Sequence, residues 1–161
     1  MDVLKGATSQ LMANDALNLS LLMSDNLQNE SDTSALKKYA YADLLIFKNL
    51  PEQALNLLDS INILYPKNSL ADDILMAKAK IYIAKNNYPE AISQLQKIVT
   101  DYATDLWADD AVFMMADIYE TKLTQPGKAK ELYQKIITNF SGSLYVTEAR
   151  KRFRNLRGDK I

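Results

Sequence analysis

The 161 residues include no His and no Cys, so the side chains that could take part in chemistry are carboxylates, Lys, Tyr and Ser. The absence of Cys excludes disulfides, zinc–thiolate sites and thiol nucleophiles. The absence of His removes the commonest general base and metal ligand near neutral pH. The chain also holds no phosphate-binding loop, nucleophile elbow or other catalytic motif. We therefore predict a protein that is not an enzyme and that uses no cofactor and no metal.

Two acidic pairs recur at a constant distance, Asp72–Asp73 and Asp109–Asp110, 37 residues apart. Their spacing is not that of a calcium-binding loop. Each pair precedes a stretch with helical periodicity, and carboxylates are favoured at the positive end of a helix dipole. We interpret both pairs as the starts of helices.

Three charged residues share the same interval: Asp43, Lys80 and Asp117. In a repeated structure they would stand at one equivalent position, with Lys80 between two carboxylates. Two interpretations stay open, a charged line that orients a ligand and a ladder of salt bridges between repeats. The ladder is favoured, and each exposed pair would contribute about 0.2–1 kcal/mol.

The interval of 37 residues also governs the apolar positions, which define the elements. Each unit contains two amphipathic helices, and a proline (Pro51, Pro89 or Pro126) opens the second, where its missing N–H costs nothing. One extra residue falls in the loop 122–127. The recurring positions are Ala42, Ala79 and Ala116; Ala54, Ala91 and Ala129; Leu58, Leu95 and Tyr133; Ile61, Ile98 and Ile136. This pattern predicts an all-α superhelix, a right-handed solenoid of about three helix–turn–helix repeats.

Both ends of the chain are incomplete units in this interpretation. Residues 7–25 are predicted to form the second helix of an earlier unit, followed by a polar loop over 26–34. Candidate N-caps there are Asp32, Thr33 and Ser34. A basic helix is expected over 144–156. The predicted divisions are 1–34 (partial repeat and loop), 35–71, 72–108 and 109–143 (three repeats), and 144–161 (capping helix and tail).

The overall composition argues against two classes of partner. The net charge of −1 gives no general attraction for nucleic acid or anionic lipid. No apolar run approaches the ~20 residues that span a membrane. The first residues do not resemble a signal peptide. We expect the chain to be a piece of a longer protein, in which membrane proximity would come from the remainder.

The segment Asn-Tyr-Pro-Glu-Ala-Ile at 87–92 resembles the turn and second helix of the tetratricopeptide repeat. The turns at 63–72 and 139–145 resemble the linkers of bacterial cell-envelope repeat proteins, such as the outer-membrane assembly lipoprotein and the Tol–Pal-associated protein. This resemblance implies a scaffold that binds a protein or peptide partner. It favours the periplasm or the outer membrane as location, while the cytoplasm stays open.

The resemblance also implies a partner surface, because the first helices of this family line the concave side of the superhelix. Two alternatives stay open: the surface binds a partner segment, or it packs on missing repeats, on the C-terminal helix or on another copy of the chain. The second alternative describes a purely structural segment that stacks or self-associates. Carried over position by position, the expected site residues are Tyr39, Asp43, Phe47, Met76, Lys80, Ile83, Phe113, Met114 and Asp117.

Two further features have a structural and a functional interpretation. The C-terminal basic cluster either caps the last helix or contacts an anionic partner. Trp107 and Tyr145 stand at equivalent turns, where an aromatic ring either wedges between units or anchors a partner. The structural interpretation is favoured for both. The cluster holds six of the 19 basic residues: Arg150, Lys151, Arg152, Arg154, Arg157 and Lys160.

Overall fold

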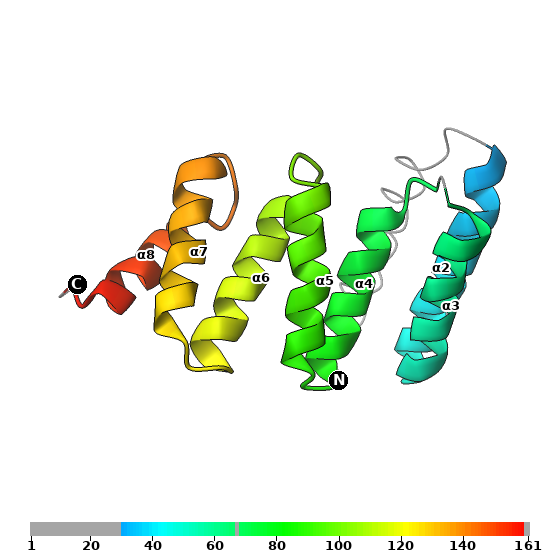
Figure 1. Cartoon of the computed structure of the whole chain (residues 1–161), viewed down its shortest axis with the longest axis horizontal. Coiled ribbons are helices and arrows are strands. Elements are labelled where there is room, and N and C mark those ends of the chain that lie inside the picture. Colours follow the sequence, from blue (N-terminus) through cyan, green and yellow to red (C-terminus); the bar gives the residue numbers. More distant parts are fainter. Residues whose placement is uncertain (1–29, 67, 160–161) are drawn as a thin grey trace, which may run out of the picture. The chain divides into compact units, whose positions relative to one another are not determined.

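The computed structural model describes residues 30–66 and 68–159, and within them it contains seven α-helices and no strand (Figure 1). The chain divides into two compact units between Leu70 and Ala71. None of the helices in these residues is long and apolar enough to cross a membrane.

The first unit contains one helical hairpin, formed by α2 (Glu30–Phe47) and α3 (Pro51–Leu64). Ala42 on α2 and Ala54 on α3 are fully buried, and so are Leu58 and Ile61 one and two turns further along α3. Alanine at these points lets the two backbones approach closely, while the larger residues fill the remaining space. The period-derived core positions of this repeat are therefore confirmed.

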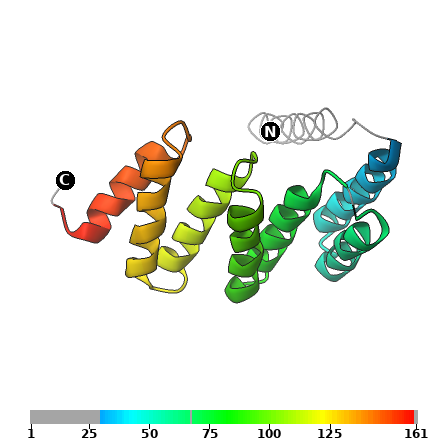
Figure 2. The same cartoon turned by 45° about the horizontal axis from the view of Figure 1, so that its top comes forward.

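The second unit contains two further hairpins and a final helix, which follow one another in chain order (Figure 1, Figure 2). Within each hairpin the helices contact one another, α5 also contacts α6, and α7 contacts α8. The elements are α4 (Ala71–Ala84), α5 (Tyr88–Asp101), α6 (Ala108–Thr121), α7 (Pro126–Asn139) and α8 (Val146–Arg157).

The core of the second unit is continuous from α4 to α8 and contains the recurring positions of both repeats. All eight are fully buried: Ala79, Ala91, Leu95, Ile98, Ala116, Ala129, Tyr133 and Ile136. Seven of the eight are purely apolar, and Tyr133 alone brings a hydroxyl into this core. The strip of core is what a solenoid requires, since each repeat buries its apolar surface against its neighbours.

The turns inside the three hairpins share one backbone feature. Asn49, Asn86 and Thr124 stand at equivalent places and have positive φ angles of 58°, 58° and 51°. Asparagine tolerates this left-handed region, whereas a β-branched residue is strained there. The loop between α6 and α7 is one residue longer than the other two, as the sequence predicts.

One expectation at the N-terminal side is wrong. The predicted loop over 26–34 is helical from Glu30 onward, because α2 begins there. None of residues 30–34 is Gly or Pro, so nothing stops the helix from extending through this polar stretch. The predicted helix over 7–25 lies outside the described residues. At the other end, α8 stops where Gly158 adopts a φ of 87°, a common left-handed helix terminus.

Candidate partner-binding surface

The nine expected site residues fall into different environments. Met76 is 1% exposed and Tyr39 is 8% exposed, so both belong to the cores of their units. Tyr39 lies on α2, which packs against α3, and Met76 lies on α4, which packs against α5. Sequence periodicity places these two side chains on the first helices but does not reveal that their side is covered. They are therefore left out of the candidate surface.

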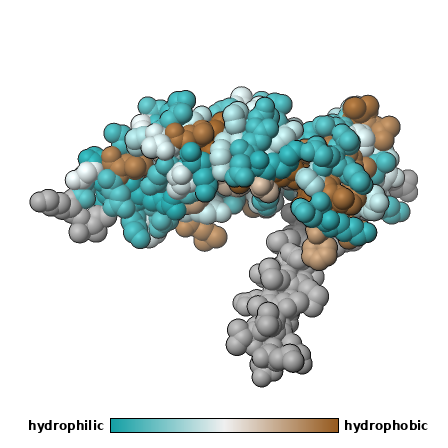
Figure 3. All heavy atoms as spheres, turned by 90° about the horizontal axis from the view of Figure 1, so that it is seen from below, coloured by the Kyte–Doolittle hydropathy of each residue, from teal (hydrophilic) through white to brown (hydrophobic). Residues whose placement is uncertain are grey.

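The first unit exposes apolar side chains along α2. Tyr41, Leu44 and Phe47 are 54%, 42% and 86% exposed, and their spacing of three residues places them on one side of the helix. Asp43 is exposed one turn before Phe47. We call Tyr41, Leu44 and Phe47 the α2 stripe. Figure 3 shows brown apolar areas at the α2–α3 end among mostly teal surface.

The second unit exposes less apolar surface on its first helices. Lys80 is exposed near the end of α4, while Ile83, Met114 and Asp117 are partly buried. Phe113 is also partly buried, and its ring stacks on the Tyr145 ring at a centroid distance of 4.4 Å. The Phe113 ring therefore contacts the residue that precedes α8, which agrees with the packing alternative for this position.

Two aromatic residues, one before α6 and one before α8, connect successive repeats within the second unit. Trp107 Nε1 donates a hydrogen bond of 2.8 Å to Asp73 Oδ1, and the Tyr145 hydroxyl donates one of 2.5 Å to Asp110 Oδ1. The hydrogen bond to Asp110 and partial burial raise the pKa of Tyr145 to about 12. Burial raises the pKa of Asp110 despite the hydrogen bond from Tyr145. The expected wedge role of both aromatic residues is confirmed.

Arg152 on α8 joins three helices through a network of charged and aromatic groups. Its guanidinium lies 2.6 Å from Asp117 Oδ1 and 3.2 Å from Glu120 Oε2 on α6, and 3.0 Å from Glu148 Oε1 on α8. It also donates to the Tyr133 hydroxyl of α7 at 3.2 Å, and that hydroxyl donates to Glu120 at 2.7 Å. Burial and the bond to Glu120 raise the pKa of Tyr133.

The repeats that carry these contacts match a known family model. The model described as tetratricopeptide repeat covers residues 73–105 and 110–143. The two matched segments together make up less than half of the chain. They correspond to the hairpins α4–α5 and α6–α7, in which the period-derived core positions are buried.

A solved structure supports the same fold over nearly the whole chain. The chain is similar to a tetratricopeptide repeat protein from Parabacteroides merdae ATCC 43184, at 14% sequence identity and a TM-score of 0.62. The match covers 98% of this chain and 59% of that protein, so the chain spans a little over half its length. A search of curated proteins finds no match. The all-α, tetratricopeptide-like repeat fold predicted from the sequence is confirmed.

The predicted charge ladder is not formed between the two helical hairpins of the second unit. Lys80 places its ammonium 4.9 Å from the centre of the Trp107 ring, and Asp117 pairs with Arg152. Equivalent positions in neighbouring repeats therefore hold different partners. Asp43 belongs to the first unit. Within the described residues, no cluster of three or more acidic side chains could hold a metal ion.

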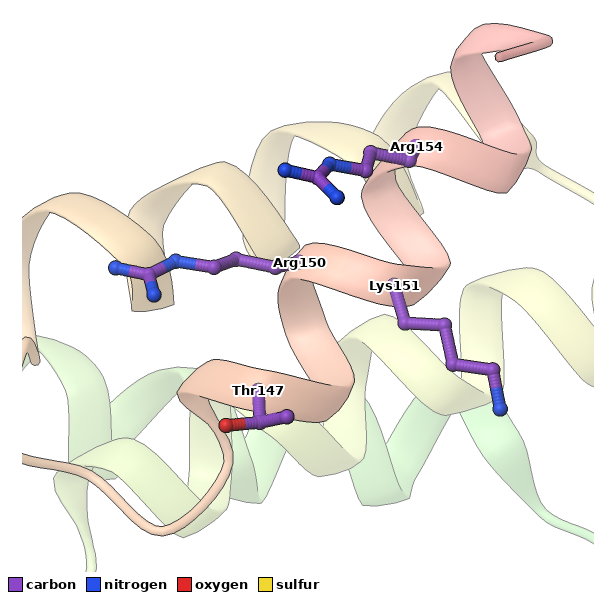
Figure 4. A pocket seen from close by; sticks show the side chains of 4 residues that line it. All are labelled: Thr147, Arg150, Lys151 and Arg154. Atoms are coloured by element: carbon purple, nitrogen blue, oxygen red, sulfur yellow. The ribbon is translucent and has the colours of Figure 1, made fainter. Parts of the chain in front are cut away.

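The basic cluster of the C-terminal helix divides into paired and unpaired residues. Arg152 belongs to the network above, and Arg157 pairs with Asp159. Arg150, Lys151 and Arg154 line a hollow on the surface of α8 together with Thr147 (Figure 4). Arg152 and Arg157 thus pair with acidic groups of the chain, whereas Arg150, Lys151 and Arg154 line the hollow.

Proposed function

We propose that this protein is a non-enzymatic scaffold that binds a segment of a protein partner along its first helices. Tetratricopeptide repeats generally mediate protein–protein interactions. The proposed surface comprises the α2 stripe with Asp43 in the first unit. A separate surface is proposed for the second unit, and it comprises the residues of the expected site that are not fully buried there, Lys80, Ile83, Phe113, Met114 and Asp117.

The observation that carries the proposal is the exposure of Phe47, which is the most exposed aromatic side chain among the described residues. An exposed aromatic ring beside other apolar side chains is typical of an interface anchor. Phe47 lies at the end of α2 with Leu44 and Tyr41 on the preceding turns. A partner with apolar side chains at helical spacing would bury this stripe and gain the corresponding hydrophobic free energy.

A photo-crosslinking amino acid at position 47 tests the proposal in the cell of origin. We expect it to capture a defined partner that the same amino acid at position 63 does not capture. Ile63 is a matched control because it is apolar, exposed and in the same unit, but on α3. Phe47→Asp should then weaken binding of the captured protein at least tenfold, and Ile63→Asp should leave it unchanged. Equal effects of the two substitutions would rule out the α2 stripe as the binding surface.

A specific observation also favours self-association as a second candidate. Leu44 stands 37 residues before Ile81 and 74 before Ile118, and both of those residues are only 3% exposed. The α2 stripe thus includes a position that other repeats use for packing. Light scattering over a range of concentrations distinguishes the two candidates. A rising mass that Leu44→Asp abolishes supports self-association, and a constant monomer mass supports a separate partner.

We further propose that these repeats belong to the C-terminal region of a longer bacterial cell-envelope protein. The support is the resemblance of the turns at 63–72 and 139–145 to envelope repeat proteins. An epitope tag at the C-terminus of the natural gene product tests this location. Fractionation should place the tagged protein in the periplasm or with the outer membrane, and a purely cytoplasmic signal would contradict the proposal.

A further inference from the structure

Helices α6 and α8 occupy equivalent places in successive repeats of the second unit. Trp107 and Tyr145 precede them, 38 residues apart. Trp107 donates a hydrogen bond to α4, and Tyr145 donates one to α6. Ala111 and Ala149 follow at the same interval and are both fully buried. Residues 108–119 of α6 therefore have counterparts 38 positions later on α8.

The side of α6 that holds α7 is known from three contacts. The Phe113 ring meets the Tyr133 ring at 5.9 Å, Glu120 accepts from the Tyr133 hydroxyl, and Lys128 stacks on Tyr119 at 4.9 Å. Ala116 lies three residues from both Phe113 and Tyr119, so it is on the same side. Val112 lies one turn before Ala116, and both residues are fully buried.

The counterparts of these positions on α8 are basic. Val112, Phe113 and Ala116 correspond to Arg150, Lys151 and Arg154, and Asp109 corresponds to Thr147. These four residues of α8 line the hollow, with Arg150 and Arg154 extending to the same side of the helix (Figure 4). The hollow therefore stands where a second helix packs in the preceding repeat.

The three cations of the hollow have no close partner. Arg150, Lys151 and Arg154 form no hydrogen bond or ion pair with the described residues. Arg154 contributes to lowering the pKa of Asp159, but the bonded partner of Asp159 is Arg157. The free cations are thus available to groups from another molecule.

We propose that this side of α8 is a docking site for an acidic amphipathic helix of a protein partner, seated as α7 is seated on α6. Arg150 and Arg154 are one turn apart, so they match carboxylates one turn apart on a facing helix. The counterpart of Tyr119 on α8 is Arg157, so the partner should carry neutral or acidic residues where α7 carries Lys128. This site is distinct from the α2 stripe.

A helix accounts for the site better than a nucleic acid or a lipid surface does. The hairpins α4–α5 and α6–α7 both place a helix at the equivalent position, and a three-cation hollow is small. Affinity for a polyanion grows with the number of phosphates that a protein neutralises, and three cations can neutralise few.

A peptide with the sequence of α7 provides the probe. Its 14 residues are synthesised with Lys128→Glu, Lys130→Glu and Lys135→Glu, a fluorescent label and a staple that holds it helical. The full chain is titrated into this acidic peptide and into the unmodified peptide, and binding is measured by fluorescence anisotropy. We expect the acidic peptide to bind the natural chain at least tenfold more tightly than the unmodified peptide.

Charge reversal on the protein decides the result. Arg150→Glu with Arg154→Glu should weaken acidic-peptide binding at least tenfold and strengthen binding of the lysine-bearing peptide. Lys97→Glu with Lys122→Glu, which changes net charge equally at exposed sites elsewhere, should change neither. Circular dichroism should show the same thermal midpoint for both variants. Phe47→Asp should have no effect, which separates this proposal from the proposed function.

Two outcomes would overturn the proposal. One is acidic-peptide binding that responds equally to both pairs of charge reversals, because this would show a nonspecific charge effect. The other is binding of the natural chain to phosphatidylglycerol vesicles, lost in the Arg150→Glu/Arg154→Glu variant, with no binding of the acidic peptide. That result would assign the hollow to a lipid surface.

Discussion

The Tyr145 hydroxyl donates a hydrogen bond of 2.5 Å to Asp110, across 35 residues of sequence. Trp107 makes the corresponding contact with Asp73, across 34 residues. In both cases an aromatic residue just before one helix (α6 or α8) bonds to a carboxylate in the first turn of the equivalent helix one repeat earlier (α4 or α6). At the corresponding places of the earliest described repeat, Leu36 and Leu70 are both buried. An apolar pair thus stands where the later repeats have a hydrogen-bonded pair.

Tyr145→Phe should destabilise the second unit by about 1–2 kcal/mol, because it leaves a partly buried Asp110 carboxylate without its hydroxyl donor. Urea denaturation followed by circular dichroism measures this loss. Tyr88→Phe is the control, since the Tyr88 hydroxyl bonds to Asn86 at the exposed surface. Equal losses for the two variants would show that the Tyr145 bond contributes no more than an exposed one.

Arg152→Met should destabilise the chain by about 1–3 kcal/mol, since it leaves three neighbouring carboxylates without their shared cation. Arg152→Lys should lose less, because it keeps the charge but not the forked geometry. Arg150→Met on the exposed side of α8 serves as the matched control and should stay within about 0.5 kcal/mol. The same urea experiment measures these changes. An unchanged free energy of unfolding in Arg152→Met would refute a stabilising role for the network.

Asp72→Asn should stabilise the chain at pH 7 and have no effect at pH 3. Burial, with a contribution from Asp105, raises the pKa of Asp72 above its ordinary value of 3.8. The folded chain therefore holds this proton to a higher pH than the unfolded chain, and stability falls as pH rises from 3.8 through the folded pKa. Denaturation at both pH values tests this. An equal gain at pH 3 and pH 7 would show that charge is not the cause.

Thr124→Asn should stabilise the α6–α7 hairpin by roughly 0.5–1 kcal/mol, because asparagine tolerates the left-handed conformation better than a β-branched residue. The φ angle of Thr124 is 51°. Asn49→Thr is the reciprocal substitution in the α2–α3 turn and should destabilise by a similar amount. Thermal denaturation measures both, and the prediction requires shifts of opposite sign.

Much of the fold is predictable from the spacing of small and apolar residues. Ala79, Ala116 and Tyr133 are buried as their period predicts, because every repeat needs the same close approach of two helices. The candidate site is less predictable. Met76 lies on the expected helix but on its covered side, and the polar sequence at 30–34 gives no signal that the helix extends through it.

The sequence by itself determined the helices, the repeat and the core, since these depend on a pattern that recurs every 37 or 38 residues. Only the tertiary structure decided the contacts between repeats. Lys80 and Asp117 share a position and yet meet Trp107 and Arg152. The physical reason is that the period relates positions 37 or 38 residues apart, whereas the contacts between repeats join non-equivalent positions. Two of these contacts join residues 34 and 35 positions apart. The exposure of Arg150 and Arg154 on α8 likewise depends on the tertiary structure, since their counterparts on α6, Val112 and Ala116, are fully buried.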